Sequence, residues 1–187
     1  MSETEIIKKV RDILNEHGGD DAISIATDRV LLEDYIKSAI PDAVVMLAQK
    51  GYRVNVAQAE PVNVTARVLG FISLIYAMDP AGWNGVVTKL TEVGSPEYIM
   101  AMNFFTPRKS NNPMCYMTER EILSFMPEIS DKGVVKYNKE YNPGEGIKAE
   151  PKEATAVCYM TAALVLGMFG DDAGKQRLSD ICMNIIA

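Results

Sequence analysis

The chain has 187 residues, of which 48% are hydrophobic and 24% charged. This balance is typical of a globular protein with one domain, or a core with an inserted subdomain. The formal net charge of −6 argues against a basic surface that binds nucleic acid by neutralising phosphates.

The three cysteines have no metal-ligand spacing, and we expect them to stay reduced and structural, as in a protein made in a cytosol. The polar, acidic N-terminus lacks the features of a signal peptide. The longest apolar run, 154–169, is shorter than the ~20 residues that span a bilayer. The sequence therefore predicts a soluble protein without a membrane-embedded segment.

Two helices are predicted in the N-terminal part of the chain. Apolar residues recur at helical spacing over 4–16, and His17-Gly18 ends that helix. A second apolar stripe begins near Thr27-Asp28, which can cap it, and ends at Lys50-Gly51. Pro41 lies inside this second pattern and is expected to kink the helix near 37–38, because proline removes one backbone hydrogen bond.

The period changes from helical to alternating between 52 and 141, which predicts a strand-rich middle with one short helix. Ser95 and Pro96 form a strong helix start, and that helix is expected to end near Phe104. The predicted strands cover Val54/Val56, Val62/Val64, 68–78 (one strand, or two pieces bent at Gly70), 86–90, a hairpin of 114–118 and 121–126, and 134–141.

The C-terminal third is predicted to form two helices, opened by Pro151 and broken once at 169–172. The first is apolar almost all the way round from Ala154 to Phe169, so it must be covered on every side. The rest of this chain, or neighbouring copies of it, has to provide that cover.

These elements predict an α+β fold, mainly a helical bundle with an inserted antiparallel β region. We expect 1–51 and 150–187 to form the bundle, with dense contacts between 4–50 and 150–187. The inserted β-rich subdomain is expected to cover 52–149.

No catalytic, cofactor-binding or metal-binding site is predicted. His17 is the only histidine, and its place at a helix C-terminus favours a capping role over an acid–base one. The paired carboxylates Asp20-Asp21, Glu33-Asp34 and Asp171-Asp172 each lie at a helix start, where the helix dipole favours acids, or on a solvated face, so a structural role is favoured over a metal site. The glycines at 144 and 146 are too few for a phosphate-binding loop.

Five residues are candidates for an interface rather than for chemistry. Trp83, in the turn cluster 79–85, either folds back on the sheet, which is the favoured interpretation, or is an exposed anchor. Arg108 and Lys109 lie in a basic loop bounded by prolines, for which a solvated loop is the simpler interpretation. Tyr159 and Ala163, on the apolar helix, complete the set.

The order of these pieces resembles the head-to-tail adaptor (connector, ring) proteins of tailed bacteriophages. A Leu-Leu-Glu-Asp-Tyr-Ile stripe is similar to the adaptor helix that follows a short first helix. A strand, tryptophan, strand and Ser-Pro-Glu-Tyr progression resembles the family's inserted β region, and an alanine-rich helix broken at Gly-Asp resembles its C-terminal pair. The matching segments are 31–43, 71–75, Trp83, 87–90, 95–98, 161–167 and 169–172.

The resemblance implies a structural virion protein and no enzyme. Copies would assemble, usually as a dodecameric ring, under the portal vertex after DNA packaging; a ring protein of a short-tailed, crAss-like phage would fit. The ring would extend the channel, through which DNA passes without specific binding, and would present a platform to neighbouring tail or ring proteins. The protein would be made in the host cytoplasm and end in the virion. The acidic balance suits a channel wall, and a neighbouring copy would help to cover the apolar helix.

Two alternatives stay open. One is a small-ligand-binding or enzymatic α+β domain with a pocket between sheet and bundle, using polar groups such as Tyr76, Tyr116 and Glu121. The other is a cytosolic regulator or scaffold. The size of the native assembly separates an adaptor, which forms rings with the portal, from an enzyme, which forms a small discrete oligomer.

Overall fold

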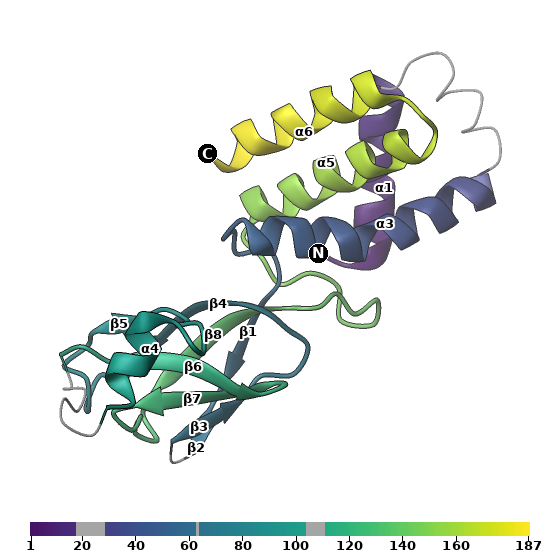
Figure 1. Cartoon of the computed structure of the whole chain (residues 1–187). Coiled ribbons are helices and arrows are strands. Elements are labelled where there is room, and N and C mark those ends of the chain that lie inside the picture. Colours follow the sequence, from purple (N-terminus) through teal and green to yellow (C-terminus); the bar gives the residue numbers. More distant parts are fainter. Residues whose placement is uncertain (18–28, 63, 104–110) are drawn as a thin grey trace. The chain divides into compact units, whose positions relative to one another are not determined.

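The computed structural model describes residues 1–17, 29–62, 64–103 and 111–187. Within these ranges the chain forms helices and two four-stranded antiparallel sheets, which confirms the predicted α+β class (Figure 1). It divides into two compact units: a helical unit, Met1–Asn55 with Glu140–Ala187, and a β unit, Val56–Lys139. The boundaries, 55/56 and 139/140, therefore differ from the predicted 51/52 and 149/150 by four and ten residues, and the helical unit takes up both connecting segments.

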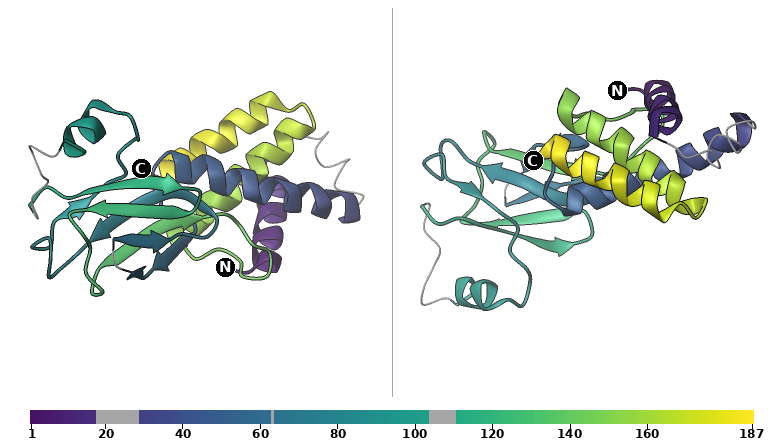
Figure 2. Two further views of the ribbon diagram at one scale, coloured as in Figure 1. Left: turned by 60° about the horizontal axis from the view of Figure 1, so that its bottom comes forward. Right: turned by 90° about the horizontal axis from the view of Figure 1, so that it is seen from above.

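In its described residues the helical unit contains four helices, α1 (Glu3–His17), α3 (Arg29–Gln49), α5 (Pro151–Met168) and α6 (Asp172–Ile186). All four predicted long helices are present, and α5 packs against each of the other three (Figures 1 and 2). The expected start of the second helix at Thr27-Asp28, like Asp20-Asp21, lies outside the described residues. Helix α3 continues through Pro41.

The apolar helix α5 is covered within its own chain. Ala156, Val157 and Ala163 are fully buried, and α1, α3 and α6 pack around the helix. Of the two sources of cover that the sequence left open, the chain itself provides it, because three helices of the same chain pack around α5. Asp171 caps α6, since its Oδ1 accepts a hydrogen bond from the amide of Gly174 at 2.8 Å.

Asn55 joins the two segments that connect the units. Its side chain is fully buried. Its Nδ2 donates to the carbonyl of Glu140 at 3.0 Å, and its Oδ1 accepts from the amide of Lys148 at 3.1 Å. The Asn55 side chain thereby pairs with one backbone acceptor and one backbone donor of the segment 140–149, which follows the β unit in the chain. These bonds hold that segment in the helical unit.

The β unit is two sheets packed face to face. The first has the order β1-β8-β4-β5 and the second β2-β3-β7-β6. A single cluster of buried side chains from both sheets fills the space between them, including Ala77, Val135 and Tyr137 from the first and Leu123 and Phe125 from the second. The strands are β1 (Val56–Ala59), β2 (Pro61–Val62), β3 (Thr65–Arg67), β4 (Phe71–Met78), β5 (Val87–Thr88), β6 (Met114–Glu119), β7 (Ile122–Met126) and β8 (Val134–Lys139).

The main difference from the predicted strands lies at Gly70. The predicted strand 68–78 begins only at Phe71, because Gly70 has a φ of +63° and occupies a turn. Its amide donates to the carboxylate of Glu121 at 2.7 Å, and this contact ties the β3–β4 turn to the predicted β6–β7 hairpin, which is present. Strand β5 is shorter than the predicted 86–90.

The short helix α4 (Pro96–Ala101) begins as predicted and ends before the expected Phe104, a residue outside the described ranges. The Ser95 hydroxyl accepts a hydrogen bond from the amide of Tyr98 at 3.2 Å, and Pro96 opens the first turn. Both views of Figure 2 show α4 standing away from the strands of the β unit, within the connection between β5 and β6.

Candidate functional site

Trp83 is not an exposed anchor. The side chain is fully buried in the core of the β unit. Its Nε1 donates to the carbonyl of Glu128 at 3.1 Å, and its ring lies 5.8 Å from that of Phe125. The favoured interpretation, a tryptophan folded back on the sheet, is confirmed, and its role as an interface candidate is wrong because no part of the side chain reaches the surface.

Asp79 holds the turn that places Trp83. Its carboxylate accepts hydrogen bonds from the amides of Ala81 and Gly82 at 3.0 and 2.9 Å and from the amide and hydroxyl of Ser130 at 2.6 and 2.8 Å. Burial raises the pKa of Asp79, but these bonds, that from Gly82 foremost, outweigh it and lower the pKa below its ordinary value. The hydrogen bonds of this carboxylate hold the 79–83 turn against Ser130, so its role is structural.

The other four interface candidates lie in different environments. Arg108 and Lys109 lie outside the described residues. Ala163 is fully buried among the helices of its own unit, so it is not available to a partner, and that assignment is wrong as well. Tyr159 is half-buried, with its ring 6.2 Å from that of His17.

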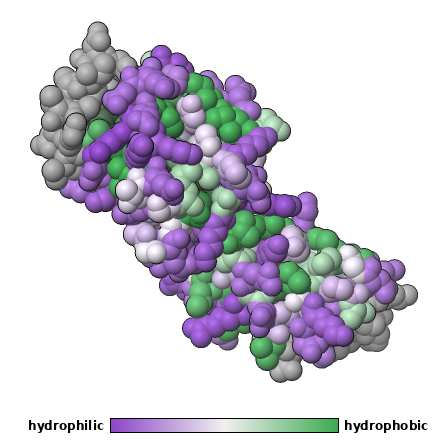
Figure 3. Space-filling view, turned by 180° about the vertical axis from the view of Figure 1, so that it is seen from behind, coloured by the Kyte–Doolittle hydropathy of each residue, from purple (hydrophilic) through white to green (hydrophobic). Residues whose placement is uncertain are grey.

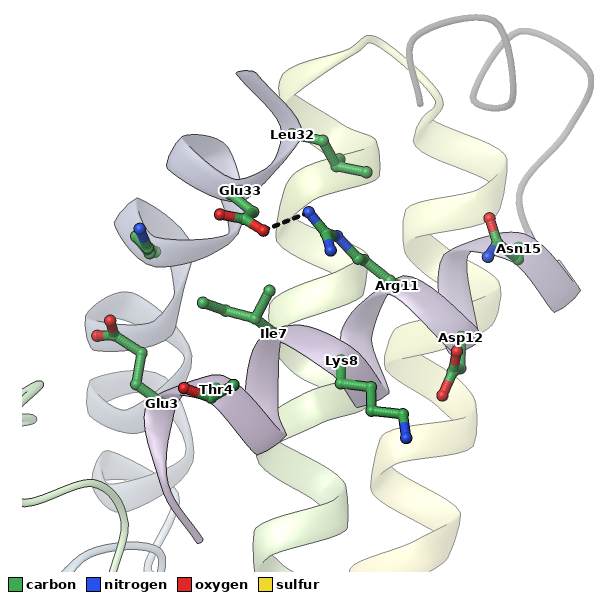
Figure 4. Close-up of a pocket in the computed structure, with 10 residues that line it drawn as sticks. Glu3, Thr4, Ile7, Lys8, Arg11, Asp12, Asn15, Leu32 and Glu33 are labelled. Atoms are coloured by element: carbon green, nitrogen blue, oxygen red, sulfur yellow. Dashed lines mark hydrogen bonds and ion pairs between the residues drawn. The ribbon is translucent and has the colours of Figure 1, made fainter. Parts of the chain in front are cut away.

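The helical unit contains a groove of about 630 Å³ between α1 and α3 (Figure 4). Ile7 and Leu32 form its apolar part, and both are buried. Figure 4 shows the guanidinium of Arg11 reaching across from α1 to Glu33 on α3, with a nitrogen–oxygen distance of 2.5 Å. This ion pair bridges the two helices at the groove.

Both signs of charge line this groove. Three basic and three acidic residues contribute: Lys8, Arg11, Lys37, Glu3, Asp12 and Glu33. Glu3 also accepts a hydrogen bond from the hydroxyl of Tyr141 at 2.9 Å. Burial, followed by this bond to Glu3, raises the pKa of Tyr141. A groove of balanced charge is suited to a polar or zwitterionic ligand, or to a charged segment of a protein partner.

The β unit exposes large apolar side chains around β5 and α4. Five large hydrophobic residues between 87 and 100 are exposed, and Ile99 and Met100 are 61% and 65% exposed: Val87, Leu90, Val93, Ile99 and Met100. Figure 3 shows that hydrophobic residues also reach the surface on the rear face of this unit. None of the five was an interface candidate from the sequence. The available signal was the helical period of 96–101, which places Tyr98 and Ala101 on one face and leaves Ile99 and Met100 off it.

The polar groups of the predicted ligand pocket serve local contacts in the β unit. The ring of Tyr76 lies 5.8 Å from Nζ of Lys136. Tyr116 makes an edge-to-face contact with Tyr98 at 5.2 Å. Glu121 accepts from Gly70 and has a φ of +64° at the β6–β7 turn. None of these contacts indicates a reaction.

The cysteines are buried free thiols. Burial raises the pKa of Cys115 to about 12 and those of Cys158 and Cys182 to about 11, so they are protonated and unreactive at neutral pH. Among the described residues no group of three or more His, Cys, Asp or Glu is placed to hold a metal ion. No helix in the described ranges has the length and hydrophobicity to cross a membrane.

Neither a protein-family model nor a curated protein matches this sequence.

Proposed function

We propose that this protein is a structural component of a tailed-phage virion, a ring that connects the portal to the tail and extends the DNA channel. In this proposal the partners are other copies of the chain, a dodecamer by the resemblance, together with the portal and neighbouring tail or ring proteins. The chain carries no catalysis, and DNA passes it without specific binding. It is made in the host cytoplasm and functions in the virion.

The observation that carries the proposal is the interleaved architecture. Helices from both ends of the chain pack in one unit, and the two-sheet unit is inserted between them. This is the layout that the resemblance to adaptors implies. The inserted unit exposes large apolar side chains, and these are candidate contacts to other subunits.

The test is direct imaging of the assembly. The purified full-length protein would be mixed with the portal protein from the same genome and examined by electron microscopy and light scattering. We expect rings that are coaxial with the portal and add to its channel. A chain that binds no portal and remains a monomer or small oligomer would refute the proposal.

The net charge of the chain supports the proposal that the protein does not bind DNA. A net charge of −6 provides little neutralisation of phosphates. In a gel-shift assay at physiological salt we expect no shift of a 30-base-pair duplex at micromolar protein. Tight binding that weakens steeply with salt would instead indicate a nucleic-acid-binding protein.

The groove between α1 and α3 favours a second candidate, a module that binds a polar small molecule. Its volume of about 630 Å³ lies within the range of ligand pockets. Its lining of mixed charge suits a polar ligand. Thermal-shift measurements with a panel of amino acids and other zwitterions test this function. A ligand that stabilises the wild type but not Arg11→Met, in a protein that forms no ring, would favour this candidate over the adaptor.

A further inference from the structure

The chain contains a single Asn-Gly pair, Asn84-Gly85, and this pair lies in the connection between β4 and β5. Both residues have a positive φ, +52° and +75°. Across them the amide of Val86 donates to the carbonyl of Trp83 at 2.9 Å. This is the geometry of a type I′ turn, which favours Asn and Gly because both tolerate the left-handed backbone conformation.

The surroundings of this turn leave its reactive groups accessible. Asn84 and Gly85 are both exposed, and within the described ranges the Asn84 carboxamide makes no hydrogen bond. The amide of Gly85 donates to the carbonyl of Asp79 at 3.4 Å, which is long for a hydrogen bond. Glycine also has no side chain to shield its own nitrogen.

We propose that Asn84 is a deamidation site, at which the chain modifies itself in water without an enzyme. The amide of Gly85 loses its proton to hydroxide, and its nitrogen attacks Cγ of Asn84. The new nitrogen–carbon bond closes a succinimide ring, and the side-chain nitrogen leaves as ammonia. Water then opens the ring. Cleavage of the bond to Cγ leaves aspartate, and cleavage of the bond to the main-chain carbonyl carbon leaves isoaspartate, whose backbone runs through the former side chain.

The neighbouring residue makes the reaction selective for this position. Every other asparagine of the chain is followed by a residue larger than glycine. Asn112 and Asn142 precede proline, which has no amide proton to lose. Attack at Asn84 starts from an opened turn, because the Gly85 nitrogen must leave its hydrogen bond. An exposed turn of this kind opens locally at a small cost in free energy.

Isoaspartate at position 84 would loosen the edge strand β5. This strand pairs with β4 only through Ala77 with Thr88 and Met78 with Val87, and the length of the connection contributes to that register. Isoaspartate adds one carbon to the backbone inside the turn and introduces a negative charge. The bond from Val86 to Trp83 that closes the turn is then lost. The site needs no partner, so it is independent of the proposed ring function.

Peptide mapping of the full-length protein tests the site. The protein would be incubated at pH 8 and 37 °C for several weeks, and mass spectrometry would measure deamidation at each asparagine. An isoaspartyl methyltransferase would count the isoaspartate formed. We expect Asn84 to react at least tenfold faster than Asn184, which is exposed on α6 but precedes isoleucine. An equal or slower rate at Asn84 would overturn the proposal.

Asn84→Gly is the matched control, because Gly-Gly also suits a type I′ turn. This variant should keep its urea midpoint, measured by Trp83 fluorescence, and form at most a tenth of the wild-type isoaspartate. The deamidated wild type, separated by anion exchange through its added negative charge, should have a midpoint lower by about 0.5 M. Equal isoaspartate in Asn84→Gly would refute the site, and an unchanged midpoint would refute the loosening of β5.

Discussion

Asn55 provides the sharpest test of how the two connecting segments are held. We consider Asn55→Leu, which fills a similar space and removes both polar groups. The change breaks the bonds to Glu140 and Lys148, at 3.0 and 3.1 Å, in a fully buried position. A hydrogen bond contributes about 1 kcal/mol and an unsatisfied buried group costs about 1–3 kcal/mol. Because both partner groups lie in segments that are partly exposed to water, we expect a loss of about 2–4 kcal/mol.

The two units offer separate probes for this measurement. Trp83 is the only tryptophan and lies in the β unit, so its fluorescence reports that unit during urea unfolding. Circular dichroism at 222 nm is dominated by the helical unit. With a urea dependence of about 2 kcal/mol per molar, the helical midpoint should fall by about 1–2 M, and the tryptophan midpoint should move less.

The control is Asn184→Leu, the same chemical change at an exposed position of α6. It should alter the free energy of unfolding by less than about 0.5 kcal/mol. A helical midpoint for Asn55→Leu within about 0.3 M of the wild type would refute the reasoning. Such a result would mean that water or other groups satisfy Glu140 and Lys148 equally well.

Three further predictions concern buried groups. Ala163→Glu places a charge among the helices around α5 and should cost several kcal/mol; a soluble variant with the wild-type urea midpoint would contradict this, and Ala173→Glu, at an exposed position of the first turn of α6, is the near-neutral control. The lowered pKa of Asp79 means that its stabilisation is present above the unfolded pKa of about 3.9 and is lost as pH falls through the folded value. Asp79→Asn should therefore flatten the acid limb of the Trp83 fluorescence transition, and an unchanged limb would show that other groups govern it. Cys115, with a pKa raised to about 12, should resist iodoacetamide at pH 8 until urea unfolds the protein; mass spectrometry of peptides checks this, and labelling of Cys115 in the folded protein would count against its burial.

The local pattern of the sequence was sufficient to locate most of the helices and strands. The spacing of apolar residues located α1, and the Ser95-Pro96 and Pro151 starts located α4 and α5, because capping and helical period depend on residues a few positions apart. The exact residues at which the elements begin and end were predicted less well. Strand β4 begins after Gly70 because a left-handed turn intervenes, a choice stabilised by Glu121, which lies 51 residues away.

Which side chains face water was decided only by the tertiary structure. Trp83 and Ala163 were both interface candidates in the sequence, and both are buried by segments distant in the chain. Ile99 and Met100, in a short helix that the sequence predicted, are exposed because Tyr98 is the residue that meets Tyr116. A period determines which residues share a face, but the direction of that face depends on long-range packing that no local pattern contains.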